Sequence, residues 1–80
     1  MGKSFKVALR LDYRGIPCQM SVLQISSKIK TVPLAAIIEV ISNDPRALTT
    51  LQAWARTTGH KIVDMQTGIG QIRFFIKRVV

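Results

Sequence analysis

The chain has 80 residues, which is enough for one domain and leaves no room for a second. Hydrophobic residues make up 48% of it, so we expect a packed core, and its single cysteine excludes an internal disulfide and a cysteine-rich zinc site. Twelve Lys and Arg against four Asp and Glu give a net charge of +8, which favours nucleic acid, acidic proteins or anionic ligands as partners, or serves solubility alone.

The N-terminal residues alternate in polarity and contain no hydrophobic run of the signal-peptide type. No segment approaches the length of a membrane span, and a lone thiol is typical of a reducing compartment. We therefore expect a cytoplasmic protein with no membrane partner. Because His60 is the only histidine, we also expect no metal and no cofactor.

Residues 4–11 alternate between apolar and polar side chains, which predicts a half-buried strand with Lys6 and Arg10 on its polar side. Residues 12–15 are then typical of a turn. Within that turn, Gly15 is free to take a positive φ.

Apolar residues recur at spacings of four and three beyond Pro17, which predicts a helix with one buried face. The residues of this stripe are Cys18, Val22, Ile25, Ile29 and Val32. Pro33 ends the helix, because the residue before a proline is pushed toward extended geometry. Cys18 is thus predicted at a helix start, where backbone N–H groups and the positive end of the helix dipole converge.

Residues 34–41 are nearly all apolar and predict a central strand. Asp44 is expected to be the N-cap of a second helix and Pro45 its first residue. Gly59 fits the position that follows the last turn of that helix.

Two further strands are predicted over residues 60–67 and 71–79, joined by a glycine turn at residues 68–70. Both helices then lie in crossover connections if the first three strands run parallel, and two helices cover one face of a sheet but hardly both. We predict a single α+β domain over residues 1–80. It is a two-layer α/β sandwich of β-α-β-α-β-β order, with a four-stranded mixed sheet and both helices on one face.

The uncovered sheet face is predicted to carry cations around an aromatic ring. Its expected members are Lys6, Arg10, Arg73, Phe75 and Lys77. Cations that neutralise phosphate and an exposed ring that stacks a base are typical of nucleic-acid binding. The alternative is that Phe75 packs on a partner subunit while the cations fill a solvent face.

The thiolate is the reactive form of cysteine, and a helix start favours it. We therefore expect Cys18 to lie in an electropositive, solvent-reachable pocket that holds its sulfur as an anion. The groups expected to stabilise this anion are Arg14, Gln19, Met20 and Ser21. The alternative is that Cys18 is a small buried hydrophobe, which is the commoner role of a lone cysteine. His60 is expected to close a helix end rather than to act as a base for the thiol.

Two blocks of the sequence resemble the TusA/SirA family of small sulfur-carrier proteins, and the resemblance covers nearly the whole chain. The family opens with Asp-x-x-Gly-x-x-Cys-Pro-x-Pro after its first strand, and the residues that stand at this spacing are Asp12, Gly15 and Cys18. The second family block is Asp-Pro, a Trp, and Gly-His, and it is matched at the same spacing by Asp44-Pro45, Trp54 and Gly59-His60.

The resemblance implies that Cys18 accepts sulfane sulfur as a persulfide, so that the protein is a sulfurtransferase if Cys18 is reactive. It implies sulfur-donor and sulfur-acceptor proteins as partners, with tRNA as a further one. The chain looks like a divergent member, because both motif prolines are replaced in Cys18-Gln19-Met20-Ser21 while Pro17 precedes the cysteine. The second hypothesis is a basic module that binds RNA or an acidic protein through its open sheet face, with no thiol chemistry.

Overall fold

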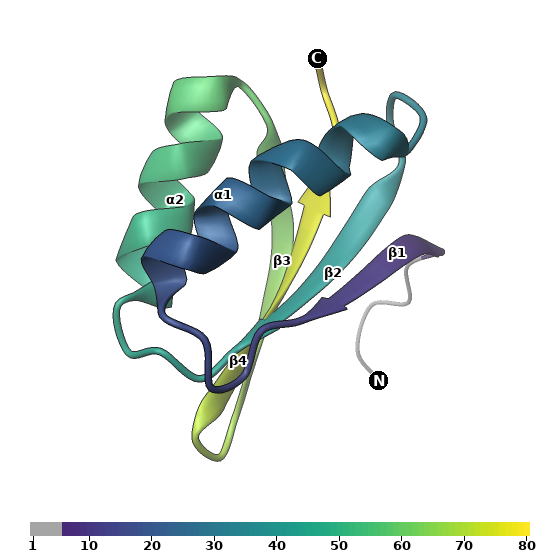
Figure 1. Ribbon diagram of the computed structural model, residues 1–80. Helices are drawn as coiled ribbons and strands as arrows, with labels where there is room; N and C mark the ends of the chain where they lie inside the picture. Colours follow the sequence, from purple (N-terminus) through teal and green to yellow (C-terminus); the bar gives the residue numbers. More distant parts are fainter. Residues whose placement is uncertain (1–5) are drawn as a thin grey trace.

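A single mixed sheet of four strands forms the base of the protein in the computed structural model, which describes residues 6–80 (Figure 1). The strands are β1 (Val7–Asp12), β2 (Ile37–Ser42), β3 (Lys61–Gly68) and β4 (Gln71–Lys77), in the spatial order β1-β2-β4-β3. β1 is parallel to β2, and β4 lies antiparallel between β2 and β3. The first three strands therefore run in one direction, which is the condition under which both helices lie in crossover connections; the part of the first predicted strand at residues 4 and 5 lies outside the described residues.

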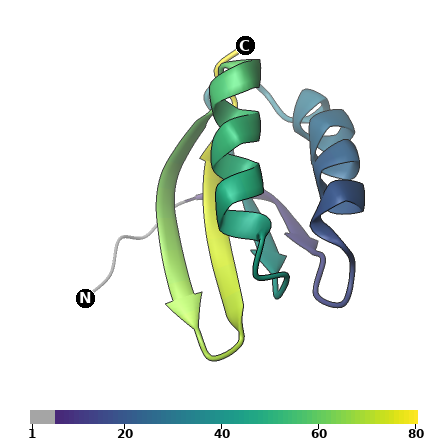
Figure 2. The ribbon, with the colours of Figure 1, turned by 90° about the vertical axis from the view of Figure 1, so that its left-hand side faces the viewer.

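Both helices lie on one face of this sheet (Figure 2). They are α1 (Cys18–Lys28), which continues as the short 3-10 helix η1 (Ile29–Thr31), and α2 (Ala47–Thr58). Between the layers lies a core whose fully buried members include Ile25, Ile29, Ile38, Val40, Leu51, Phe74 and Ile76. The predicted two-layer sandwich is confirmed. No helix within residues 6–80 is long and apolar enough to cross a membrane.

The second strand begins at Ile37, three residues later than predicted. A turn precedes it, in which the Ala36 N–H donates to the Pro33 carbonyl at 3.1 Å and Ala35 has a φ of +69°. The backbone of Arg78 then pairs with residues 35 and 36. Apolar composition predicted a strand here, but the chain after Pro33 must first turn back toward the sheet.

The second helix begins at Ala47, so the predicted N-cap at Asp44 and first turn at Pro45 are wrong. The Asp44 carboxylate instead accepts the backbone N–H of Arg46 at 2.9 Å, which closes a local turn before the helix. The C-terminal prediction is confirmed, because Gly59 follows the last turn with a φ of +89° and donates its N–H to the Ala55 carbonyl.

A register shift in β3 changes which of its side chains meet the core. Ile62 pairs with Ile76 and Asp64 pairs with Phe75, although Ile76 and Phe75 are adjacent on β4. Strict alternation would place Ile62 and Asp64 on the same face, and the extra residue between them separates the two. Ile62 therefore packs against the core, and Asp64 turns to the uncovered face.

Candidate functional site

Cys18 is the first residue of α1, as predicted, but its side chain is buried with an exposed fraction of 3%. The buried face of α1 carries Cys18, Ser21 and Ile25, so the helix turns its first side chain toward the core. The sulfur lies 3.5 Å from the hydroxyl of Thr50 on α2. The expected solvent-reachable position of this thiol is therefore wrong for this conformation, because the apolar stripe that defines the helix includes Cys18 itself.

The backbone N–H groups at the start of α1 are mostly engaged. The Met20 and Ser21 N–H groups donate to the Pro17 carbonyl at 3.0 and 3.1 Å, and the Ser21 hydroxyl donates to the same carbonyl at 3.3 Å. Among the described residues, the Gln19 N–H has no acceptor, and it is the predicted donor that stays available to an anion. The Met20 side chain is exposed to solvent.

Two neighbouring residues of the β2–α2 loop hold the chain that leads into α1. Asn43 Oδ1 accepts the Gly15 N–H at 2.8 Å, and Asp44 Oδ2 accepts the Cys18 N–H at 2.9 Å. We call these two hydrogen bonds the clasp. Gly15 has a φ of +82°, as predicted, which aims its N–H at Asn43 without side-chain strain. The clasp caps α1 from a distant part of the sequence, and Asp44 thus serves the first helix in place of the second.

Arg14, the cation expected beside the sulfur, pairs with Asp12 instead. Its Nε lies 2.9 Å from Asp12 Oδ1 and its Nη2 lies 2.6 Å from Asp12 Oδ2. The hydrogen bond from the Arg14 side chain is the main reason that the Asp12 pKa is lowered to about 2. Both side chains are exposed. Asp12 therefore holds Arg14 at the surface rather than beside the sulfur.

Arg46 pairs with Asp44, the carboxylate that holds the Cys18 N–H. Its Nε and Nη2 lie 3.4 Å from the two carboxylate oxygens of Asp44. The pKa of Arg46 is raised, first by its hydrogen bond to Asp44, then by the Asp44 charge, and then by a smaller electrostatic contribution from Cys18. The pKa of Asp44 is held well below its usual value by the backbone N–H groups of Arg46 and Cys18 and by the Arg46 side chain.

Sequence reasoning missed the roles of Arg46 and Thr50. Arg46 follows the Asp44-Pro45 pair, and Thr50 lies one helical turn further along the chain, on α2. The second family block, which begins at Asp44-Pro45, was a signal for this region, since these residues lie in the loop whose Asp44 contacts Cys18. Together Cys18, Asp44, Arg46 and Thr50 form a polar cluster at the first turns of the two helices.

The uncovered sheet face is built around a buried carboxylate rather than an exposed ring. Glu39 Oε2 lies 3.2 Å from Nε of both Arg10 and Arg73, as ion pairs whose N–H groups are not aligned with that oxygen. Phe75, the register partner of Glu39, is buried with an exposed fraction of 6%, so the prediction of an exposed aromatic is wrong.

Of the other residues assigned to this face, Lys6 is exposed and Lys77 is half-buried. Alternation along β4 predicted the face of Phe75 correctly, but it does not predict exposure. The binding of RNA or of an acidic protein to this face stays a prediction.

His60 lies after the end of α2, whereas Cys18 contacts Thr50 near the beginning of that helix. Its Nδ1 accepts the backbone N–H of Val79 at 3.2 Å. The structure therefore does not bring His60 to the thiol. Within residues 6–80, no three His, Cys, Asp or Glu side chains are grouped so that they could hold a metal ion.

Comparison with known proteins identifies similar chains. The family model described as "Sulfurtransferase TusA" matches residues 9–78. A protein of Bacillus subtilis named "Putative sulfur carrier protein YrkI" is 32% identical over 77 residues that cover 95% of this chain and 97% of YrkI. Sulfur carrier protein TusA of Allochromatium vinosum is 25% identical over 68 residues, which cover 85% of this chain and 90% of that protein.

A further relative in Bacillus subtilis is named "Putative sulfur carrier protein YrkF". It is 25% identical over 73 residues, which are 91% of this chain. Because the match covers only 40% of YrkF, this chain spans less than half the length of that relative.

Proposed function

Because the chain belongs to the TusA family, we propose that it is a sulfur carrier in which Cys18 accepts sulfane sulfur as a persulfide and passes it to a partner protein. The observation that carries this proposal is the position of the only cysteine at the first residue of α1, where its N–H donates to Asp44 at 2.9 Å and Asp44 in turn pairs with Arg46. A cation near the sulfur favours both the thiolate and the anionic persulfide.

The transfer is a thiol exchange that needs no added oxidant or reductant. The Cys18 thiolate attacks the terminal sulfur of a donor persulfide, a new S–S bond forms at Cys18, and the S–S bond of the donor breaks. The donor leaves as a thiolate, and the transferred sulfur keeps its proton when it becomes the outer sulfur of the Cys18 persulfide. An acceptor thiolate then repeats the exchange on the Cys18 persulfide, which regenerates the Cys18 thiolate.

The buried position of Cys18 requires that the sulfur be uncovered during each exchange. The two hydrogen bonds of the clasp hold the loop that leads into α1, so their release would let this loop and the first turn move away from Thr50. Between exchanges, burial would shield a persulfide from other thiols. Exchange would then take place mainly on a partner that displaces the clasp.

The partners we propose are a sulfur-donor protein and a sulfur-acceptor protein in the cytoplasm, where a lone thiol stays reduced. A net charge of +8 favours acidic docking surfaces on both of them. If tRNA were a direct partner, its affinity would fall steeply with added salt, because phosphate contacts release counterions.

Mass spectrometry of the intact protein after incubation with a persulfide donor tests the proposal. We expect the wild type to gain the mass of one sulfur atom, which a reducing thiol then removes. Cys18→Ser should gain nothing, and Ser27→Ala, which changes an exposed serine on the same helix, should behave as the wild type. A wild-type protein whose thiol is alkylated by iodoacetamide but never acquires sulfur would contradict the carrier function.

A further inference from the structure

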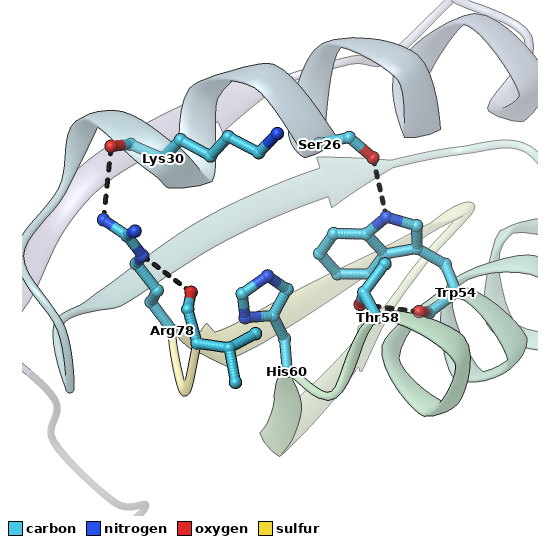
Figure 3. A pocket seen from close by; sticks show the side chains of 7 residues that line it. Ser26, Lys30, Trp54, Thr58, His60 and Arg78 are labelled. Atoms are coloured by element: carbon cyan, nitrogen blue, oxygen red, sulfur yellow. Dashed lines mark hydrogen bonds between the residues drawn. The ribbon is translucent and has the colours of Figure 1, made fainter.

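A cavity of about 460 Å³ opens at the far end of the helix pair from Cys18 (Figure 3). Its lining residues come from α1, η1, α2, the turn between α2 and β3, and the segment after β4, and they are Ser26, Lys30, Trp54, Thr58, His60, Arg78 and Val80. Ser26 lies roughly 12 Å further along α1 than Cys18, at about 1.5 Å of rise per residue. The cavity is therefore separate from the proposed sulfur site.

The aromatic side of the cavity is fixed by hydrogen bonds. The Trp54 indole N–H donates to the Ser26 hydroxyl oxygen at 2.7 Å, and the Thr58 hydroxyl donates to the Trp54 carbonyl at 2.7 Å. The His60 ring lies against Trp54 with a centroid distance of 5.5 Å and an interplanar angle of 30°. Two of the lining rings are thus held in place without a ligand, and a ligand would lose little by ordering them.

The His60 ring offers a hydrogen-bond donor. Its Nδ1 accepts the Val79 N–H, so the neutral ring must carry its proton on Nε2. Burial and the charge of Arg78 lower the pKa of His60, which keeps the ring neutral near pH 7.

Two cations line the cavity, and no acidic side chain does. Arg78 is fixed by its Nη1, which donates to the carbonyls of Lys30 and Val32 at 3.2 and 2.7 Å. Figure 3 shows the Lys30 side chain extended along the helix from Arg78 toward Ser26. Within residues 6–80, the Lys30 ammonium forms no ion pair. Arg78 Nε also donates to the Val80 oxygen at 3.0 Å, so Lys30 and the His60 Nε2–H are the lining groups left for a ligand.

We propose that this cavity binds a small organic anion, whose carboxylate or phosphate oxygens accept hydrogen bonds from Lys30 and from His60 Nε2 while its apolar part packs against the Trp54 and His60 rings. The volume lies within the range of about 300–1,000 Å³ that is usual for small-molecule sites. The proposal uses no property of Cys18, so binding should be the same in Cys18→Ser.

Trp54 is the only tryptophan, and its indole N–H signal in an NMR spectrum reports on the cavity wall. The probes are phenyl phosphate and phenylacetate, with benzyl alcohol as a neutral molecule of similar size and inorganic phosphate as an anion without an apolar part. The variants are Lys30→Met and its matched control Lys28→Met, which removes the same charge from an exposed lysine of α1 outside the cavity.

We expect at least one of the two aromatic anions to shift the Trp54 signal saturably in the wild type and in Lys28→Met. In Lys30→Met the affinity should fall about tenfold, which is the usual loss when one charge-assisted hydrogen bond is removed. Benzyl alcohol and inorganic phosphate should each bind at least tenfold more weakly than the better anion, and the preferred anion distinguishes a carboxylate from a phosphate ligand.

The proposal is overturned if neither aromatic anion produces a saturable shift. It is also overturned if Lys28→Met and Lys30→Met weaken binding equally, because the effect would then come from net charge. Equal binding of benzyl alcohol would show an apolar cavity with no anion recognition. Thermal unfolding of both variants confirms that any loss of binding occurs in folded protein.

Discussion

The backbone N–H of Cys18 donates a 2.9 Å hydrogen bond to Oδ2 of Asp44, so the residue that carries the thiol is capped by a carboxylate from the loop before the other helix. The same carboxylate faces the guanidinium of Arg46. Asp44 therefore combines two effects on the sulfur site. It holds the first turn of α1 in place, and it brings a cation to the neighbourhood of the thiol.

Asp44→Ala should expose the thiol. Loss of this carboxylate is expected to lower the free energy of unfolding and to loosen the turn that buries Cys18. We expect iodoacetamide to alkylate Cys18 several-fold faster than in the wild type. Asp12→Ala is the matched control, because it removes another carboxylate that pairs with an arginine but does not touch Cys18; an equal acceleration in this variant would rule out a specific role of the clasp.

Arg46 rather than Arg14 should govern reaction of the thiol with an anionic reagent. Arg46 pairs with Asp44, which also accepts the Cys18 N–H, whereas Arg14 pairs with Asp12, which makes no contact with Cys18. We expect Arg46→Gln to slow the reaction with an anionic aromatic disulfide several-fold at low salt, with a smaller effect at high salt. Arg14→Gln should react at the wild-type rate, and a slower reaction in Arg14→Gln than in Arg46→Gln would reverse this assignment.

The contribution of Asp44 to stability should depend on pH in the acid range. Its pKa is lowered on folding, so the stabilisation is fully present above the unfolded value of about 4 and is lost as the pH falls through the folded value. We expect Asp44→Asn to be less stable than the wild type near pH 6, with a difference that narrows steadily below pH ~4. Urea unfolding of both proteins at a series of pH values measures this difference; a gap that stays constant to the lowest pH would show that the carboxylate charge has no part in it.

Tyr13→Phe should stabilise the protein. Tyr13 is buried with an exposed fraction of 5%, and its hydroxyl has no hydrogen-bond partner within residues 6–80. Removal of this unsatisfied group should raise the free energy of unfolding by about 1 kcal/mol, as measured by urea unfolding.

Alkaline pH provides a second measurement on Tyr13. Burial raises the Tyr13 pKa, so the folded wild type resists ionisation of this phenol and should lose stability above about pH 10. Tyr13→Phe should lack this part of the alkaline loss. If the variant is less stable than the wild type at neutral pH, the hydroxyl has a partner that stabilises the fold.

The spacing of apolar residues was enough to predict the two layers of this protein, a sheet and the helices on one of its faces. The stripe from Cys18 to Ile29 and the alternation along β4 predicted which side chains enter the core, because burial repeats with the geometry of each element. It did not locate the turn at Ala35 or the shift after Ile62, since both depend on how neighbouring strands align rather than on local composition.

The sulfur site was predicted only in part. The family spacing identified Cys18 and Gly15, and local chemistry placed the cysteine at a helix start. The partners Asp44, Arg46 and Thr50 come from a later segment, and nothing in the residues around Cys18 specifies them. Arg14 was expected beside the sulfur because it is near Cys18 in the sequence. Asp12 is nearer still, only two residues away, and its carboxylate binds the Arg14 guanidinium instead.

The strand order also has a consequence for biosynthesis. β3 has no sheet neighbour other than β4, and β2 keeps one open edge until β4 is in place. A nascent chain that ends before Gln71 therefore exposes apolar strand edges of the kind that other chains can pair with. Native assembly must therefore wait until β4 has been translated, so a chain that terminates before Gln71 should give an insoluble fragment rather than a smaller stable protein.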